Sequence, residues 1–424
     1  MRTLLVYIEI HGERRLAGSI AGNSLEDACF QYDKTYLSSP YGAPVSISLP
    51  LQKEPFSALQ TKCFFEGLLP EGFSRKAVAN WMKADENDYL TILSVLGAEC
   101  LGAIKIIEEQ GRTSGSGYEK LTMEQVQRLA AEGATKSTEI LLKTHLSLTG
   151  ATGKAGLYLD EKSNTWYLPR GDAPSTHIVK QSHIRLSRIV LNEQLCMLTA
   201  KKLGIDVPYS FIINTGKGKD PEILYATRRY DRPYSGDKCI DSLPVPLRLH
   251  QEDFAQAMGI SARDKYEKTD SGYLRRMFAM IRFHCSDPVA EQIKLWKMIC
   301  YSYLIGNTDC HIKNYSFLYG EDLRDIRLAP AYDIVSTRVY HMTNEMSFFI
   351  GGELDICHIK RSTFSIAAKD AGLSERLAMR LFDELADRFE PALNAASEEL
   401  ELLGFDTCAA MKDTIIANGG YANL

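Results

Sequence analysis

The pattern of apolar residues changes once along this chain, and that change limits the folds that the chain can adopt. Up to about residue 250, short alternating apolar stretches are bounded by Gly, Pro and Asn, as is typical of β-strands joined by turns. From about Gln251 onward, apolar residues recur mainly at helical spacing. A β-rich part followed by a helical part predicts an α+β architecture of two lobes with a cleft between them.

The first hundred residues predict a small domain with strands and helices. Alternation on both sides of Gly12 predicts a β-hairpin. The next expected elements are two helices and a closing strand, at residues 74–83, 89–96 and 102–107. The stretch 109–117, EQGRTSGSG, is the clearest linker, and a short helix follows it with Thr122 as its expected N-cap.

The composition of the 424 residues fits soluble globular domains, because 45% hydrophobic and 24% charged residues exclude a mainly disordered or fibrous chain. No apolar run approaches the roughly 18 residues of a membrane span, and the strand-like start at residues 3–10 argues against a signal peptide. The ten cysteines form no C-x-x-C pair, which favours a reducing cytoplasm over a zinc site or a disulfide framework. The formal charge of -5 argues against general nucleic-acid binding but permits a DNA-bound partner.

The middle of the chain predicts a second mixed lobe. Strands are expected at 141–147 and 157–160 around a glycine-rich turn, and a third strand at 177–180. Residues 192–203 predict an amphipathic helix that Gly204 stops.

The glycine-rich turn contains Gly150, Gly153 and Lys154 at a spacing that is too short for a Walker A motif. Such a loop can present backbone N–H groups to phosphate oxygens, with the lysine as a counter-charge. Alone, the pattern fits a tight hairpin turn equally well.

A stronger pattern places Asn314 five residues after Asp309, the interval between the catalytic Asp and the metal-binding Asn of protein kinases. The spacing lets one carboxylate meet an attacking hydroxyl while a nearby amide oxygen holds Mg²⁺ against the nucleotide phosphates. A helix expected from about Ala290 to Gly306 precedes this loop, which strengthens the assignment.

Three further residues complete the pattern of a phosphoryl-transfer site. Asp333 follows a strand–turn pattern beyond Asn314, where a kinase-like fold keeps its second metal-binding carboxylate. Lys180 on the third strand could contact the α and β phosphates, and Glu193 on the next helix could orient that lysine. Alone, Lys180 or Glu193 would fit a solvated surface charge, but the order of all these elements favours the catalytic interpretation.

With these residues identified, the chain resembles the HipA-type serine/threonine kinase toxins of bacterial toxin–antitoxin systems. The resemblance extends over nearly the whole chain, and LLPEG (68–72) is similar to the N-terminal subdomain of the long form of the family. The supporting strings are SLTGATGK (147–154), THIVK (176–180), NEQLCMLTAKKLGIDVP (192–208), RRYDR (228–232), LRLHQEDFAQAMG (247–259), GNTDCHIKN (306–314) and AYDIVS (331–336).

The resemblance implies a kinase-like core, with a β-rich N-lobe and a helical C-lobe, preceded by a small β-containing subdomain. The expected segments are an N-terminal subdomain (1–108), a linker with a short helix (109–139), an N-lobe with the glycine-rich loop (140–244) and a helical C-lobe with the catalytic loop (245–424).

The resemblance also implies the roles of individual residues. Asp309 would be the catalytic base, and Asn314 and Asp333 would hold Mg²⁺. The expected ATP-binding residues are Thr149, Gly150, Ala151, Thr152, Gly153, Lys154, Lys180, Arg228, Arg229, Tyr230, His311, Ile312, Lys313, Asn314, Tyr332 and Asp333.

Ser147 corresponds to the loop serine that such kinases phosphorylate on themselves, although a plain serine at the end of a strand is the alternative interpretation. Two positions depart from the family pattern. Relatives carry Glu at the position of Arg228, so backbone groups are the expected adenine contacts there, and Gly153 stands where Glu is common.

The resemblance therefore implies an ATP- and Mg²⁺-dependent protein kinase that arrests growth by phosphorylating a translation component, with an aminoacyl-tRNA synthetase such as glutamyl-tRNA synthetase as the candidate target. Its expected partner is a small helix-turn-helix antitoxin, HipB-like, that binds operator DNA. Two alternatives remain open: a catalytically silent co-repressor that docks on the antitoxin, and a small-molecule or lipid kinase, because D-x-H-x-x-N also occurs in lipid-kinase-like loops.

Overall fold

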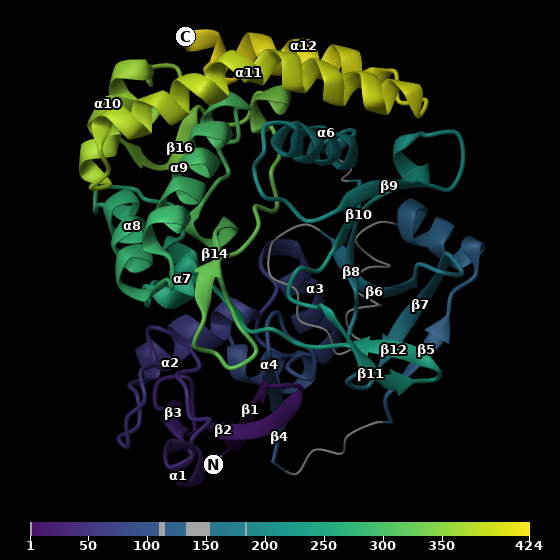
Figure 1. The fold of residues 1–424 in the computed structure, drawn as a ribbon. Coiled ribbons are helices and arrows are strands. Elements are labelled where there is room, and N and C mark those ends of the chain that lie inside the picture. The colour runs from purple at the N-terminus through teal and green to yellow at the C-terminus, as the bar shows by residue number, and fades with distance from the viewer. Residues whose placement is uncertain (1, 110–114, 133–152, 183–184) are drawn as a thin grey trace. The chain divides into compact units, whose positions relative to one another are not determined.

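Residues 2–109, 115–132, 153–182 and 185–424 are described by the computed structural model (Figure 1). They form two units. The first unit comprises Met1–His183, Ile213–Ala262 and Phe317–Ile326, and the second comprises Ile184–Ile212, Arg263–Ser316 and Arg327–Leu424. The main sheets lie in the first unit and most long helices in the second, so the predicted α+β class is confirmed.

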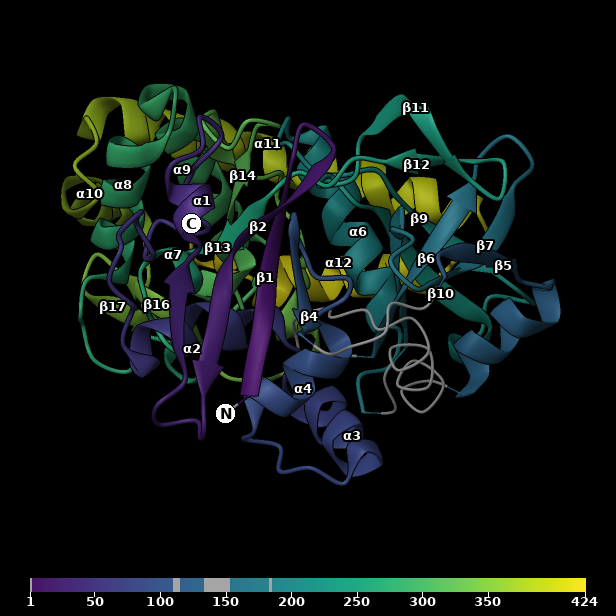
Figure 2. The ribbon, with the colours of Figure 1, turned by 90° about the horizontal axis from the view of Figure 1, so that it is seen from below.

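The chain begins with the predicted hairpin. Its two-residue turn, His11–Gly12, has φ angles of 52° and 71°, and positive φ at both positions matches the twist of the flanking strands. The hairpin belongs to a four-stranded sheet of order β3-β2-β1-β4, whose strands β1 and β2 stand out in Figure 2. The strands are β1 (Arg2–Ile10), β2 (Glu13–Gly22), β3 (Cys29–Tyr32) and β4 (Ile104–Glu108).

Short helices accompany this sheet, namely α1 (Lys34–Leu37), α2 (Ala58–Phe65), α3 (Gly72–Met82) and α4 (Tyr89–Leu96). Ser57 and Gln60 form a reciprocal capping box at the start of α2, and the Asp88 carboxylate accepts from the Thr91 backbone N–H at the start of α4. The helices predicted at 74–83 and 89–96 and the strand predicted at 102–107 are therefore confirmed.

The second sheet of the first unit has the order β5-β7-β6-β8-β10-β9. A helix begins after Thr122, which caps it as predicted: its hydroxyl accepts from the Gln125 backbone N–H. The strands are β5 (Gly117–Lys120), β6 (Lys154–Asp160), β7 (Thr165–Arg170), β8 (His177–Gln181), β9 (Ser210–Asn214) and β10 (Ile223–Arg228). The predicted strands at 157–160 and 177–180 lie within β6 and β8, whereas 141–147 lies outside the described residues.

The other strands are β11 (Tyr234–Ile240), β12 (Leu243–Pro246), β13 (Gln251–Asp253), β14 (Ser316–Tyr319), β15 (Ile326–Leu328), β16 (Glu345–Ile350) and β17 (Glu353–Asp355). A short helix, α7 (Phe254–Ala257), follows β13 directly, and the Asp253 carboxylate caps it by accepting from the Gln256 backbone N–H.

The second unit is built around a long helix, α11, which packs against α6, α9, α10 and α12; α11 and α12 are the yellow pair in Figure 1. The Trp296 side chain is fully buried, and its indole N–H donates to the Ala378 backbone oxygen, which joins α9 to α11. The helices are α6 (Ile189–Lys202), α8 (Tyr273–His284), α9 (Pro288–Leu304), α10 (Arg361–Asp370), α11 (Glu375–Leu402) and α12 (Thr407–Asn418). Among the described residues, no helix is long and apolar enough to cross a membrane.

Helix α6 differs from its prediction. The sequence predicts an amphipathic helix at 192–203, but Asn192, Glu193 and Gln194 are all buried. The predicted polar face is therefore wrong over this first turn, because these polar side chains lie inside the protein rather than in water. A buried polar side chain needs hydrogen-bond partners, and Asn192 has them in a segment far along the chain.

Candidate catalytic site

The loop after α9 presents one exposed carboxylate in otherwise buried surroundings. Asp287 caps the start of α9 and Pro288 occupies its first turn, which fixes where the helix begins. The helix ends before Gly306, whose φ of 73° turns the chain into the loop. Asp309 is exposed, whereas Thr308 and Cys310 on either side of it are buried.

Hydrogen bonds within the loop fix the position of Asp309. The Asn307 side-chain oxygen accepts from the Asp309 backbone N–H at 3.1 Å. The Asn314 amide donates to the Asp309 backbone oxygen at 2.8 Å, and the His311 backbone N–H donates to the same oxygen at 2.9 Å. The predicted five-residue interval between Asp309 and Asn314 therefore closes a loop in which the two residues are directly joined.

Two residues from later segments of the second unit, Thr337 and Ser347, form hydrogen bonds with this loop. The Thr337 hydroxyl accepts from the Thr308 backbone N–H at 2.9 Å and donates to the Gly306 backbone oxygen at 3.0 Å. The Ser347 hydroxyl, on β16, donates to the Thr308 backbone oxygen at 2.8 Å. Sequence reasoning missed both residues, because single hydroxyl side chains carry no signal of a distant partner.

Asp333 has a strained backbone and lies next to a hydrogen-bonded tyrosine. Its φ is 56°, a left-handed conformation that is uncommon outside glycine and that clusters at functional sites. The Tyr332 hydroxyl donates to the Lys313 backbone oxygen at 2.9 Å and lies 2.5 Å from the Ser316 hydroxyl. A single tyrosine therefore ties the residue before Asp333 to the residue before Asn314, the two predicted metal ligands.

Asn192 fixes the chain on the other side of Asp333. Its amide nitrogen donates to the Ser336 backbone oxygen at 3.0 Å, and its amide oxygen accepts from the Ser336 backbone N–H at 2.9 Å. The Asn192 side chain thus bonds both backbone groups of Ser336, as the backbone of a neighbouring β-strand would. The signal in the sequence was a polar residue at the start of an apolar helix, but its partner could not be inferred from spacing.

The residues present fit a magnesium site with few protein ligands. Among the described residues, no three His, Cys, Asp or Glu side chains gather as a metal cluster. Mg²⁺ in phosphoryl-transfer enzymes takes one or two carboxylates, with waters and substrate phosphates completing the shell. The Asn314 amide nitrogen is bonded to the backbone, so its oxygen is the end left to face a cation, and Asp333 offers a half-buried carboxylate.

His311, Ile312 and Lys313, also predicted to bind ATP, are buried members of the same loop. The His311 ring meets the ring of Tyr266 edge-on, with centroids 5.2 Å apart. The Tyr266 hydroxyl donates to Asp309 Oδ1 at 2.5 Å. Tyr266 is a residue that sequence reasoning missed, because it lies in an irregular segment without a motif.

The predicted phosphate-binding lysines lie in the first unit. Lys180 on β8 is directly opposite Lys154 on β6 in the ladder, and opposite Tyr225 on β10 on its other side. Both lysines are more than 90% buried, and the Lys180 ammonium lies 5.6 Å from the centre of the Tyr225 ring. The prediction placed Lys154 in the glycine-rich loop, whereas the structure places it on β6 as its first residue.

Several predicted residues lie outside the described part of the chain, namely Ser147, Thr149, Gly150, Ala151 and Thr152. Gly153 is the first residue described after that segment and is buried. Glu193 lies on α6 in the second unit and is 4% exposed, so the alternative of a solvated surface charge is wrong for this residue. Its role in orienting Lys180 stays a prediction.

Arg228, Arg229 and Tyr230, at the end of β10, have three different environments. Arg228 is exposed and forms an ion pair with Glu161. The Tyr230 hydroxyl donates to the Gln251 side chain. Arg229 is fully buried and donates twice to Asp231, at 3.0 and 2.8 Å. The Arg229 guanidinium is therefore engaged by a carboxylate within the protein, so that only its backbone is available for an adenine contact.

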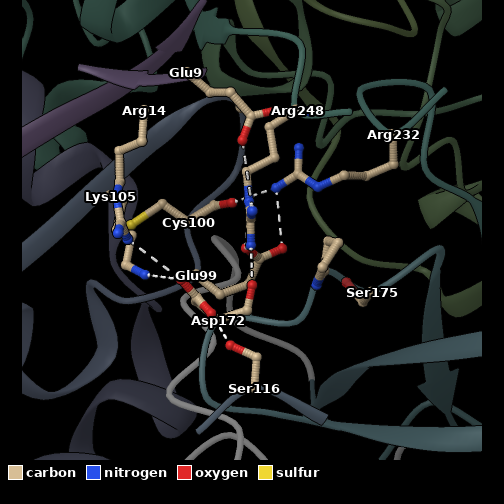
Figure 3. Close-up of polar contacts among 12 residues, drawn as sticks. Glu9, Arg14, Glu99, Cys100, Lys105, Ser116, Asp172, Ser175, Arg232 and Arg248 are labelled. Atoms are coloured by element: carbon tan, nitrogen blue, oxygen red, sulfur yellow. Dashed lines mark hydrogen bonds and ion pairs between the residues drawn. The ribbon is translucent and has the colours of Figure 1, made fainter. Parts of the chain in front are cut away.

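Arg229 belongs to a buried ion network, defined here as Glu9, Glu99, Arg229, Asp231, Arg232 and Arg248, that joins the N-terminal sheet region to the segment after β10. Figure 3 shows four of its members, Glu9, Glu99, Arg232 and Arg248. Glu99 accepts from Arg229 at 3.2 Å, Arg232 at 3.0 Å and Arg248 at 2.6 Å. The Gly102 backbone N–H donates to Asp231 at 2.9 Å.

Two carboxylates of this network, Glu99 and Asp231, have lowered pKa values, which favours their ionised forms. Burial alone would raise the pKa of Glu99, but the guanidinium groups of Arg248, Arg232 and Arg229 outweigh it and hold that pKa below its ordinary value. Asp231 responds in the same way: burial opposes ionisation, yet Arg229 and Arg232 lower its pKa to about 2. Arg229, Asp231 and Arg232 of the RRYDR string thus form ion pairs in the interior of the first unit.

Nearby, Asp172 accepts hydrogen bonds from Lys105, Ser116 and Arg14 (Figure 3). The Asp172 backbone oxygen also accepts from Arg248 at 2.6 Å, so this second group of charges is continuous with the buried network. Burial opposes ionisation here too, and hydrogen bonds from Lys105 and Ser116 lower the pKa of Asp172 to about 2.

Two models of protein families match this chain. The family model "HipA N-terminal domain" matches residues 8–107, and "HipA-like C-terminal domain" matches residues 146–393. "Putative kinase Y4mE" of Sinorhizobium fredii is 27% identical and covers 94% of both chains. The serine/threonine-protein kinase toxin HipA of Shewanella oneidensis is 25% identical over 91% of this chain and 88% of its own.

A solved structure has the same fold. It is the Shewanella oneidensis toxin–antitoxin complex of HipA, HipB and operator DNA, which matches with a TM-score of 0.78 and 24% identity over 98% of this chain and 96% of that chain. The match confirms the predicted kinase-like α+β fold with an N-terminal subdomain. Because both HipA domains match in the expected order and the C-terminal one spans more than half of the residues, this chain belongs to the HipA family of kinases.

Proposed function

We propose that this HipA-family kinase is an ATP- and Mg²⁺-dependent serine/threonine protein kinase that acts as a growth-arresting toxin. The observation that carries the proposal is the exposed side chain of Asp309, whose backbone is held by hydrogen bonds to Asn307 and Asn314 in an otherwise buried loop. A scaffold protein has no use for a rigid loop with a single exposed carboxylate, whereas phosphoryl transfer needs a positioned proton acceptor.

Each residue then has a defined task. Asp309 accepts the proton of the attacking hydroxyl, and Asn314 and Asp333 hold Mg²⁺. When bound, the ion neutralises charge on the nucleotide phosphates. Lys180 and Lys154, on paired strands, provide positive charge for the phosphates of ATP. The Thr149–Gly153 segment and the backbone of 228–230 complete nucleotide binding in this proposal.

The proposal includes self-inactivation through Ser147. A phosphate there adds about -1.5 to -2 charges. Repulsion between unit charges about 5 Å apart, at an effective dielectric constant near 20, is on the order of 3 kcal/mol. A phosphorylated Ser147 should therefore weaken ATP binding, and unchanged ATP affinity of a Ser147-phosphorylated preparation would contradict this part.

The partners follow from the relatives. The solved relative is a complex with HipB and operator DNA, so we assign to this chain a small helix-turn-helix antitoxin and, through it, operator DNA. The target is a component of translation, with an aminoacyl-tRNA synthetase such as glutamyl-tRNA synthetase as the first to test. A reducing cytoplasm, where translation takes place, is the compartment that this function requires.

The decisive experiment is incubation of the purified chain with Mg²⁺ and ATP, followed by phosphosite mapping by mass spectrometry, beside Asp309→Ala purified in the same way. Phosphate on Ser147 in the wild type alone supports the proposal. Transfer to a lipid or small molecule in a substrate panel, but to no protein, would replace it with a metabolite kinase. ATP binding with no transfer to the chain, to lysate proteins or to the panel would leave a silent co-repressor.

A further inference from the structure

The contact between Tyr266 and Asp309 points to a function for Tyr266. The Tyr266 hydroxyl donates to Asp309 Oδ1 at 2.5 Å, within the second unit. A short O–H···O bond to a carboxylate is of the charge-assisted class, which is about twice as strong as a neutral hydrogen bond. Asp309 is exposed, and this bond fixes one of its two carboxylate oxygens.

The Tyr266 ring is positioned by two neighbours. His311, two residues beyond Asp309, meets the ring edge-on, with an interplanar angle of 84°. The Lys265 ammonium lies 5.4 Å from the centre of the ring. The tyrosine is 40% exposed, and these contacts restrict a side chain that could otherwise turn into solvent.

The backbone that carries Tyr266 is anchored by the next residue. Glu267 is 3% exposed, and its Oε1 accepts from the Ser271 backbone N–H at 2.7 Å and from the Tyr273 backbone N–H at 3.0 Å. Its Oε2 accepts from the Phe349 backbone N–H, on β16, at 3.0 Å. A buried carboxylate therefore closes the segment from Tyr266 to α8 and fastens it to a strand.

The same strand holds the catalytic loop. The Glu267 backbone N–H donates to the Ser347 backbone oxygen at 2.8 Å. The Ser347 hydroxyl donates to the Thr308 backbone oxygen, also at 2.8 Å. Ser347 thus joins the residue after Tyr266 to the residue before Asp309. The tyrosine and the aspartate are therefore connected twice, directly by their side chains and indirectly through Ser347.

We infer that Tyr266 is a positioning residue for phosphoryl transfer: its hydroxyl holds Oδ1 of Asp309, which orients Oδ2 toward the hydroxyl group of the protein substrate. The inference rests on the proposed kinase function and deepens it. A carboxylate has two oxygens, and one fixed oxygen leaves the other with a single direction. Holding a base in its reactive geometry accelerates transfer without changing the affinity for ATP.

The test compares Tyr266→Phe with wild type in the transfer of phosphate from Mg²⁺–ATP to the chain itself. The expected result is an approximately ten-fold lower maximal rate, with an unchanged ATP concentration for half-maximal rate and an unchanged melting temperature. The matched control is Tyr273→Phe, which removes a hydroxyl that donates only to the Asp264 backbone oxygen at 2.7 Å; we expect it to keep the wild-type rate.

The outcomes separate this inference from the proposed function. No transfer by the wild type to itself, to lysate proteins or to the substrate panel would defeat the proposed function itself. Wild-type transfer with an equal or faster rate for Tyr266→Phe would overturn the positioning role, as would a raised half-maximal ATP concentration at an unchanged maximal rate. If Tyr266→Phe and Tyr273→Phe lose rate equally and in proportion to lost melting temperature, the tyrosine serves stability alone.

Discussion

Arg229 and Glu99 lie 130 positions apart in the chain and meet with a nitrogen–oxygen distance of 3.2 Å, with both side chains at most 3% exposed. Glu99 is the shared acceptor of three arginines, so it compensates more buried charge than any single pair would. A buried ion cluster of this kind adds little net stability relative to apolar packing, but it is costly to break, because the remaining charges lose their partner.

Glu99→Gln should therefore destabilise the first unit strongly. The substitution keeps the shape of the side chain but leaves Arg229, Arg232 and Arg248 without this negative charge. We expect a loss of about 3–5 kcal/mol in the free energy of unfolding, measured by chemical denaturation. Asp383→Asn, which breaks the exposed pair of Arg361 and Asp383, is the control and should cost less than about 1 kcal/mol. Equal effects of the two substitutions would mean that the network is unimportant for stability.

Glu252 should give the first unit a pH-dependent stability. It is 1% exposed and accepts from the Ser46 hydroxyl, the Ile47 backbone N–H and the Tyr319 hydroxyl. Burial raises its pKa from 4.5 to about 7, against the effect of these donors. The folded chain thus holds a proton that the unfolded chain has lost, so this contribution is complete below about pH 4.5 and disappears as the pH rises through about 7.

The measurement is the free energy of unfolding of wild type and Glu252→Gln between pH 4.5 and 8. The difference between the two curves should change with pH by a few kcal/mol, because glutamine cannot release a proton. The absolute stability of the variant is not the readout, since glutamine also loses acceptor capacity. Parallel curves would contradict the assignment of a raised pKa to Glu252.

Gly306 should be indispensable at the entrance to the catalytic loop. Its φ is 73°, and a Cβ there would lie 2.8 Å from the Arg338 side chain and 3.0 Å from the Gly419 Cα. Gly204, after α6, has a similar φ of 78° but no described heavy atom within 4 Å of such a Cβ. Gly204→Ala should thus cost only the conformational penalty of about 1–2 kcal/mol, whereas Gly306→Ala should cost more and also lower the kinase rate.

The two alanine variants are compared by melting temperature and by phosphate incorporation. A larger loss for Gly306→Ala in both measurements is the expected outcome. If Gly204→Ala is equally destabilising, the steric contacts of Gly306 do not matter and backbone conformation explains both effects.

Asp333→Asn should remove the contribution of Mg²⁺ to the affinity for ATP. Asparagine tolerates the left-handed backbone of Asp333 but lacks the charge that a hard cation prefers. Calorimetry should show ATP affinity reduced about ten-fold or more in the presence of Mg²⁺ and unchanged in EDTA. Asp370→Asn, at an exposed position on α10, neutralises an equal charge elsewhere and should leave both affinities unchanged. A Mg²⁺-independent loss for Asp333→Asn would argue against a metal-binding role.

The contact in the candidate site that could be expected from the sequence is the one encoded by short-range spacing. Asp309 and Asn314 are five residues apart and are joined directly, so that their interval carries the geometry. The positions of Tyr266, Asn192 and Ser347 depend instead on contacts across 39 or more residues, and no local pattern records such contacts. For the same reason the family resemblance assigns Arg229 to the nucleotide, whereas its side chain is directed to Glu99 and Asp231.

Helix α6 shows the same limit at the level of a whole element. Its end just before Gly204, a glycine with positive φ, agrees with the prediction, whereas the helix begins at Ile189, three residues before the predicted start. The burial of Asn192 and Glu193 was not, because hydrophobic periodicity assumes that polar side chains face water. Asn192 does not meet that assumption, because its side chain forms two hydrogen bonds with the Ser336 backbone inside the protein.

The buried network also has a consequence for the order of events during synthesis on the ribosome. Glu99 is made 149 residues before Arg248, an interval of roughly 7 to 30 seconds at about 5–20 residues per second. Until the arginines emerge, the carboxylates of Glu9 and Glu99 must remain hydrated, because an unpaired charge is not buried. The first segment to be translated is therefore among the last to complete its folding.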